Sequence, residues 1–192
     1  EEKAFRLIMV ADPQAQCEFH IKRFERETVP DIRQYVDAQT LPCYGITLGD
    51  IVYTEGEHKT NKFMEPMRRA MSYDNTHLLF FQTMGNHDYT YFKSGQPISA
   101  DETSSTYNIK AQRVFEDVFG PINHSWNRGD AHIVCMRNMQ WNSTTSAGDY
   151  SMKFTDEQYE WLKQDLSFVP KDKLVIFCVH IPLTNSSAQN VQ

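Results

Sequence analysis

Short apolar runs alternate with longer amphipathic segments along the chain. The apolar runs cover residues 5–12, 43–50, 77–84 and 172–183, and each has the length of a strand. Continuous apolar runs of this length are typical of strands buried in a sheet. Helix-like segments separate the first three runs, so we expect consecutive strands to pair in parallel through right-handed crossovers. The pattern therefore predicts an α/β fold.

Two helices are expected between these strands. The first covers about residues 18–39, and Pro30 interrupts or restarts it. Its expected inward-facing side chains are Phe24, Ile32, Tyr35 and Val36. The second helix covers residues 61–73. Its expected core residues are Phe63, Met64, Met67 and Met71. Methionines at this helical spacing favour packing in the core over binding a cofactor.

The second half of the chain predicts two further helices and a hairpin. Residues 91–106 are rich in turn formers, so we expect a loop there, followed by a helix over residues 108–120 that ends at Gly120. Residues 124–138 are typical of a hairpin whose turn is "NRGD". The "RGD" tripeptide favours a tight turn over an adhesion motif. A helix over residues 154–169 is expected to begin at an N-cap threonine.

Polar residues follow each apolar run at the point where the strand should end. Asp12 ends the first run, Asp50 ends the second, the "GNHD" tetrapeptide of residues 85–88 follows the third, and His180 lies near the end of the last. The carboxyl ends of parallel strands meet at one edge of a sheet, and ligands bind at that edge. These residues, which are distant in the sequence, should therefore converge in space.

Composition narrows the class of protein. The chain has 192 residues, 40% of them hydrophobic, which suits one globular domain over residues 1–192. The net charge of -6 is spread without a basic block, so no nucleic-acid-binding surface is expected. No apolar run approaches the roughly 20 residues of a membrane span, and the first residues are not a signal peptide. The sequence leaves the oligomeric state open.

Four cysteines occur singly, with no C-x-x-C pair, which argues against a structural zinc site. Cys43, Cys135 and Cys178 lie in or beside apolar runs and are expected to be buried thiols. A serine-hydrolase elbow and a P-loop are also absent from the sequence. Aspartates, an amide and histidines on one rim instead suit divalent cations such as Mn, Mg, Zn or ferrous iron. Two such ions can clamp a phosphate and supply a nucleophile.

Four short motifs resemble the successive signatures of the calcineurin-like metallophosphoesterase superfamily. They are "ADPQ", "GD" at residues 49 and 50, "GNHD" and "VHIP", and they span residues 12–180. The resemblance is to bacterial members with an Asp-x-Gln first motif. It implies a four-layer α/β/β/α sandwich and a dinuclear metal centre. It also implies hydrolysis of a phosphate-ester substrate by a hydroxide that bridges two divalent metal ions (Mn, Fe, Zn or Mg).

The resemblance also implies roles for particular residues. The metal ligands would be Asp12, Gln14, Asp50, Asn86 and His180, with Asp50 as the bridge between the two ions. His87 would be the catalytic histidine, which stabilises the transferring phosphoryl group or protonates the leaving oxygen. Asp88 would support catalysis by orienting His87.

Three departures from the family pattern are visible. Gln14 stands where histidine is commoner, and a neutral amide would hold the first metal more weakly. Tyr53 and Thr54 replace the acid and arginine of the protein phosphatase branch, which disfavours a close relationship with it. The final G-H-x-H motif does not follow His180, so we expect the domain to be truncated before it.

An alternative function is a catalytically silent metal- or phosphate-binding domain of a larger envelope protein. The departures favour it slightly, whereas the retained "GNHD" tetrapeptide favours the enzyme. The resemblance to bacterial envelope proteins also suggests an extracytoplasmic location, in the periplasm or the cell envelope. Among the other histidines, His58 and His124 could reach the rim. We expect His20 and His77 at the surface or at an interface, and His132 to pack or to form a hydrogen bond.

Overall fold

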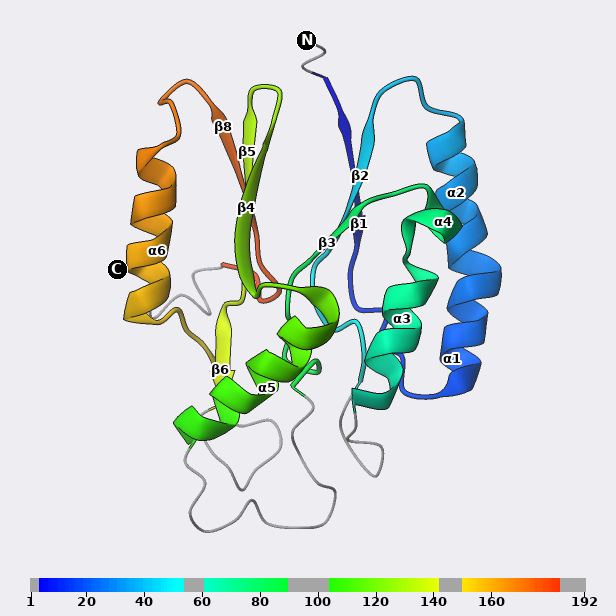
Figure 1. Ribbon diagram of the computed structural model, residues 1–192, viewed down its shortest axis with the longest axis horizontal. Coiled ribbons are helices and arrows are strands. Elements are labelled where there is room, and N and C mark those ends of the chain that lie inside the picture. Colours follow the sequence, from blue (N-terminus) through cyan, green and yellow to red (C-terminus); the bar gives the residue numbers. More distant parts are fainter. Residues whose placement is uncertain (1–3, 54–60, 90–103, 142–149, 184–192) are drawn as a thin grey trace.

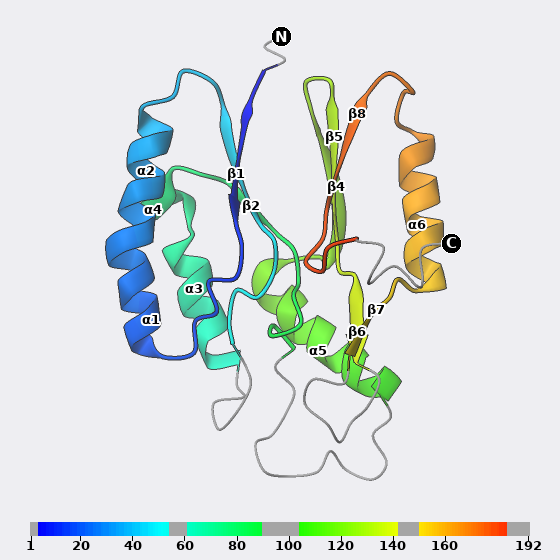
Figure 2. The same ribbon diagram turned by 180° about the vertical axis from the view of Figure 1, so that it is seen from behind.

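The fold consists of two three-stranded sheets that face each other, with helices on their outer sides (Figure 1). A computed structural model describes residues 4–53, 61–89, 104–141 and 150–183. Helices α1 to α4 lie outside the first sheet and helix α6 lies outside the second, as the view from behind also shows (Figure 2). The layers therefore follow the order α/β/β/α, which confirms the predicted sandwich.

The first sheet contains the three strands expected in the first half of the chain. They are β1 (Arg6–Val10), β2 (Cys43–Thr47) and β3 (Phe80–Gln82). Both pairings are parallel, as predicted, and the order is β1-β2-β3, so the strand that leads to Asp50 is the middle one. Strand β1 lies at the edge, where Met9 is 50% exposed. The prediction that this first run is a buried strand is therefore only partly right.

The second sheet combines the predicted hairpin with the last strand. Its members are β4 (Asn123–Arg128), β5 (Ala131–Met136) and β8 (Leu174–Cys178), in the order β4-β5-β8. The hairpin turns at Gly129, whose φ of 56° suits a tight two-residue loop. Strand β8 pairs with β5 in parallel and lies at the edge, with Leu174 largely exposed.

The first helical region is continuous but not uniform. It runs through α1 (Glu18–Arg23), a π-helical stretch η1 (Phe24–Thr28) and α2 (Val29–Asp37). Pro30 lies at the start of α2. Because proline has no N–H to donate to the preceding turn, the wider π-helical turn before it lets the helix continue. The predicted restart at Pro30 is thus confirmed.

Several smaller elements differ from the predictions. The helix expected over residues 61–73 is divided into η3 (Asn61–Phe63), α3 (Met64–Ala70) and α4 (Tyr73–Thr76). Helix α5 (Ser104–Phe119) begins four residues earlier than expected, because serine and threonine at a helix start look like turn formers. The rest of the expected loop lies outside the described residues. The pairing of β6 (Met139–Trp141) with β7 (Tyr150–Met152) was not predicted.

The C-terminal helix begins as the sequence predicts. Helix α6 (Asp156–Ser167) has Thr155 as its N-cap. The Thr155 side chain accepts a hydrogen bond from the Gln158 N–H at 3.2 Å, and the Gln158 side chain accepts one from the Thr155 N–H at 3.0 Å. This reciprocal pair satisfies N–H groups that the first helical turn would leave open.

The core has two parts. One lies between the sheets and consists of Ile46, Ala131, Ile133, Cys135 and Cys178. The other lies against the helices and includes the predicted stripe of Phe63, Met64, Met67 and Met71. Three residues that were expected to be inside differ: Tyr35 is 47% exposed, and Val36 and Cys43 are only partly buried. Within the described residues, no helix is both long and apolar enough to cross a membrane.

Candidate metal centre

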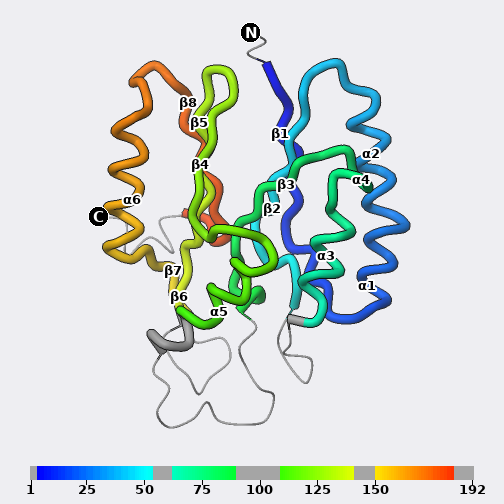
Figure 3. Tube along the Cα trace, in the orientation of Figure 1, coloured from blue at the N-terminus to red at the C-terminus, as the bar shows by residue number. Residues whose placement is uncertain are grey.

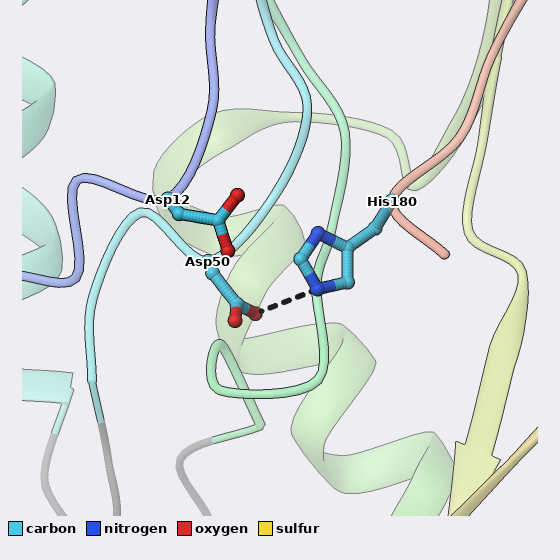
Figure 4. A group of neighbouring side chains, drawn as sticks. All are labelled: Asp12, Asp50 and His180. Carbon is cyan, nitrogen blue, oxygen red and sulfur yellow. Dashed lines mark ion pairs between the residues drawn. The ribbon is translucent and has the colours of Figure 1, made fainter. Parts of the chain in front are cut away.

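The carboxyl ends of β1, β2, β3 and β8 come together between the two sheets (Figure 3). Asp12 follows β1, Asp50 follows β2 and His180 follows β8, and their side chains face one another (Figure 4). One ligand atom from each of these three residues lies within 4.8 Å of the other two. The convergence expected from parallel strand pairing is therefore present.

Backbone hydrogen bonds fix the first two loops against each other. The Asp12 N–H donates to the Gly49 carbonyl at 3.2 Å, and the Gln14 N–H donates to the Asp50 carbonyl at 2.9 Å. Asp12, Gln14 and Asp50 all have positive φ values, of 52°, 46° and 53°. A left-handed backbone conformation costs free energy in residues other than glycine. Residues with this conformation cluster at functional sites.

The two carboxylate oxygens of Asp50 face different neighbours. Oδ1 lies 3.3 Å from Nε2 of His180, and it also accepts a hydrogen bond from the His87 N–H at 2.8 Å. Oδ2 accepts a hydrogen bond from the Gln14 amide at 3.2 Å. Asp50 is 2% exposed, so this carboxylate is buried between two sets of polar side chains. The arrangement is suited to a carboxylate that bridges two ions.

Asn86 and His180 form the second set. Asn86 Oδ1 lies 2.9 Å from Nε2 of His180, and the other ring nitrogen of His180 faces the Leu48 carbonyl at 2.8 Å. The same Nε2 would be free to bind a cation beside the Asn86 oxygen once it has lost its proton. Amide oxygen, carboxylate and imidazole are donors that divalent ions accept, so the residues present fit such an ion.

His87 lies directly beside Asp50. Its ring Nε2 is 3.7 Å from Oδ2 of Asp50. The ring stacks on Tyr53, with centroids 4.4 Å apart and an interplanar angle of 28°. Sequence reasoning noted Tyr53 only as a departure from one branch of the family. The stacking could not be found from the sequence, because it depends on how the loops after β2 and β3 pack together.

Asp88 holds the loop that carries Asn86 and His87. One carboxylate oxygen accepts a hydrogen bond from the Val52 N–H at 3.0 Å, and the other accepts one from the Gly85 N–H at 2.8 Å. The sequence suggested that Asp88 orients His87, but its hydrogen bonds go to the backbone, so its effect on His87 passes through the loop. Burial, and then the nearby charge of Asp50, raise the pKa of Asp88 to about 7.

Glycines allow the two loops to approach so closely. A Cβ on Gly85 would overlap the backbone nitrogen and Oδ1 of Asp50. A Cβ on Gly49, where φ is 92°, would lie 2.8 Å from Nδ1 of His180 and from the Gly85 backbone. Glycine is therefore required at both positions because a side chain would not fit between the loops. At Gly49 the positive φ also favours glycine.

The remaining histidines have other partners. His132 is buried between Asp165 and Asn127, at 2.8 and 3.0 Å, which confirms its expected hydrogen-bonding role. His77 pairs with Asp37 near the surface. The ring of His124, which was considered a candidate for the rim, bonds to the Pro121 carbonyl and lies 6.1 Å from the Phe81 ring. His58 lies outside the described residues.

The state of His180 gives a testable pH dependence. Burial alone would lower its pKa, but the hydrogen bond and charge of Asp50, helped by the Leu48 carbonyl, raise it from 6.5 to about 9 in the metal-free protein. A cation at Nε2 must displace this proton. We therefore expect the Kd for Mn²⁺ to fall about tenfold per pH unit from pH 7 to 9 and to level off above that.

Titration calorimetry in buffers of different ionisation enthalpy measures this proton release. Close to one proton per chain should be released from His180 near pH 7.5 when an ion replaces that proton. The variant His180→Asn has no proton to lose there and should show weaker but nearly pH-independent binding. An unchanged Kd across this pH range in the wild-type chain would contradict the assignment.

Three comparisons relate the chain to known proteins. The family model described as calcineurin-like phosphoesterase matches residues 6–191. A comparison with curated proteins gives no match. Among solved structures, the chain is similar to the structure of PhoD, with a TM-score of 0.42 and 10% identity. That likeness covers 85% of this chain but only 39% of the other, so this chain spans less than half of its length.

Proposed function

The chain belongs to the calcineurin-like phosphoesterase family, and we propose that it hydrolyses phosphate esters with two divalent ions held at this centre. The observation that carries the proposal is the position of Asp50. Its Oδ1 faces Nε2 of His180, and its Oδ2 faces the Gln14 amide. One buried carboxylate thus lies between two groups of potential ligands.

The described residues divide into two ligand sets around Asp50. Asp12 and Gln14 would hold the first ion, and Asn86 and His180 would hold the second. Oxygen and imidazole donors of this kind suit Mn, Fe, Zn or Mg. When bound, the ions would supply an attacking hydroxide and neutralise charge on the phosphoryl oxygens.

The protein's own residues would position the reacting groups and donate a proton to the leaving oxygen. Hydrogen bonds between the loops would hold the carboxylates in place before substrate binds, which avoids the cost of ordering them during the reaction. His87 lies at the edge of the centre, where a protonated imidazole could donate to the leaving oxygen. The stacked Tyr53 ring limits the directions in which the His87 ring can turn.

The proposal is tested by loading the chain with Mn²⁺, removing free ion and counting bound metal. The same sample is then assayed with p-nitrophenyl phosphate as the monoester and bis(p-nitrophenyl) phosphate as the diester. About two ions per chain, together with metal-dependent release of p-nitrophenol, would support the proposal. Two ions without turnover of either ester would support the silent binding domain instead.

The variant His87→Asn should separate metal binding from catalysis. We expect kcat for an ester with a poor leaving group to fall by roughly 10²–10⁴-fold, because proton donation to the leaving oxygen is lost. Metal content should stay unchanged, since this role does not require His87 to be a ligand. The matched control His77→Asn replaces a histidine near the surface and should leave kcat unchanged. Loss of metal from His87→Asn would contradict the assigned role.

A further inference from the structure

The segment between β5 and β6 contacts both loops of the second ligand set. Asn138 is completely buried, at 0% exposure. Its amide nitrogen donates to the Ile181 carbonyl at 2.6 Å, and its amide oxygen accepts a hydrogen bond from the Ile181 N–H at 3.1 Å. One side chain thus satisfies both backbone polar groups of the residue that follows His180.

This contact matters because His180 lies beyond the regular part of the sheet. The last pair in the β5–β8 ladder is Cys135 with Cys178. From that point the backbone has no ladder bond, so side chains must set the direction of the chain. Asn138 does so at Ile181, immediately after the residue whose Nε2 faces Asn86 and Asp50.

The neighbouring residue contacts the other loop. The Tyr89 hydroxyl donates to the Met139 carbonyl at 3.1 Å, and Tyr89 directly follows the "GNHD" tetrapeptide. The loop that carries Asn86 and the loop that carries His180 are therefore both tied to residues 138 and 139. Buried hydrogen bonds of this kind hold groups in register, because breaking either partner would leave a polar atom without solvent.

The segment is itself held firmly. The Arg137 side chain donates to Oε1 of Gln158 at 3.0 Å and to the Met139 carbonyl. The Lys153 N–H donates to the Asn138 carbonyl at 3.0 Å. Because Gln158 also takes part in the capping pair of α6, residues 137–139 are anchored to a helix on the outer face of the second sheet.

We propose that Asn138 is a positioning residue for the second metal position, fixing the His180 loop relative to the Asn86 loop through Ile181. The inference rests on the proposed function, because it assumes that Asn86 and His180 act together as ligands. Residues that orient metal ligands typically change metal affinity by about 10–100-fold when they are altered. Asn138 would therefore influence the centre without touching the ion or the substrate.

The test compares Asn138→Ala, which removes both hydrogen bonds, with Asn138→Asp, which keeps the acceptor for the Ile181 N–H. Two quantities are measured: exchange of the Ile181 amide hydrogen in the metal-free proteins, and the Kd of each Mn²⁺ binding step. The matched control is Thr76→Val. Thr76 lies in helix α4, away from the centre, and is also fully buried, and its hydroxyl donates a hydrogen bond to the Ser72 carbonyl.

For Asn138→Ala we expect at least about tenfold faster exchange at Ile181, unchanged exchange at Ile133, and at least about tenfold weaker binding in one of the two Mn²⁺ steps. Asn138→Asp should show smaller changes of both kinds at pH values where its carboxyl is protonated, because the O–H can then donate to the Ile181 carbonyl. It keeps the test informative if the alanine variant does not fold. Thr76→Val should lower stability without weakening either Mn²⁺ step.

The outcomes separate this inference from the proposed function. If the wild-type chain binds two ions and both Asn138 variants bind them equally well, the inference is wrong and the function stands. If the wild-type chain binds no Mn²⁺, the proposed function fails, and the metal role of Asn138 fails with it. If Thr76→Val also weakens both Mn²⁺ steps, the inference is overturned, because any loss of stability would then weaken metal binding.

Discussion

Replacing Asp50 with asparagine should remove both divalent ions and lower phosphoester hydrolysis by roughly three orders of magnitude or more. The substitution keeps the shape of the side chain but removes its charge. Both oxygens of Asp50 face donors: the His87 N–H lies against Oδ1, and the Gln14 amide donates to Oδ2. Whichever way the new amide turns, its NH₂ group faces another donor. The variant would therefore lose the proposed bridge and would also strain both loops.

The same variant should change the metal-free protein. Asp50 provides the hydrogen bond and the charge that raise the pKa of His180 to about 9. Without that carboxylate, burial dominates, and the pKa of His180 should fall well below that value. NMR titration of the His180 ring would measure this fall independently of metal binding.

A matched control is available in the second sheet. Asp165 is a partly buried carboxylate that accepts a hydrogen bond from the Ser125 hydroxyl at 2.6 Å and contacts His132. Asp165→Asn should therefore cost stability but leave the Mn²⁺ count near two. Metal counting by mass spectrometry on both variants decides the matter. Retention of two ions by Asp50→Asn would show that Asp50 is not the bridge.

The convergence of the three candidate ligands that follow the first sheet could be predicted, because it follows from strand direction. Parallel strands deliver their carboxyl ends to one edge, so Asp12, Asp50 and Asn86 had to meet once the helices between them were recognised. The observed strand order places the strand that leads to Asp50 in the middle of the first sheet.

Contacts between the loops that follow the strands could not be predicted in this way. The bond from Asn138 to Ile181 depends on where the β5–β6 connection lies relative to the end of β8. The stacking of Tyr53 on His87 depends on two loops that are distant in the sequence. No sequence pattern indicates either contact, since a buried asparagine and a loop tyrosine can each have many roles.

Solvent exposure was also hard to predict for particular residues. An apolar run does not reveal whether its strand is central or at an edge, so the exposure of Met9 and Leu174 was missed. Tyr35 has helical spacing with Ile32, but its ring lies at the surface. A tyrosine can cover the margin of a core without entering it.

Gly85→Ala should disable the centre although it alters no ligand. The added Cβ would overlap the Asp50 backbone nitrogen and Oδ1, and it would lie 3.0 Å from the Asp50 Cγ. Part of this obstacle is backbone, so it cannot be relieved by turning one flexible side chain. Asp50 has to move, or the "GNHD" loop has to retreat from it. Overpacking of this kind typically lowers the free energy of unfolding by about 1–3 kcal/mol.

The loss of metal should be larger than that loss of stability suggests. Asp50 and Asn86 are held together by the close approach of these two loops, so a displaced loop separates the bridge from the second ligand set. We expect Gly85→Ala to bind at most one Mn²⁺ and to lose most of its hydrolysis. Metal counting and urea denaturation of the metal-free protein measure the two effects separately.

Gly120→Ala provides the matched control. A Cβ at Gly120 would meet nothing within 4 Å, but its φ of 92° makes alanine strained there. This variant should therefore lose about 1–3 kcal/mol of stability through backbone strain and keep both ions. If the two glycine variants lose stability equally but only Gly85→Ala loses metal, the cause is the displaced Asp50 carboxylate. If Gly85→Ala keeps two ions, the close packing of the two loops is not what holds the ligands in place.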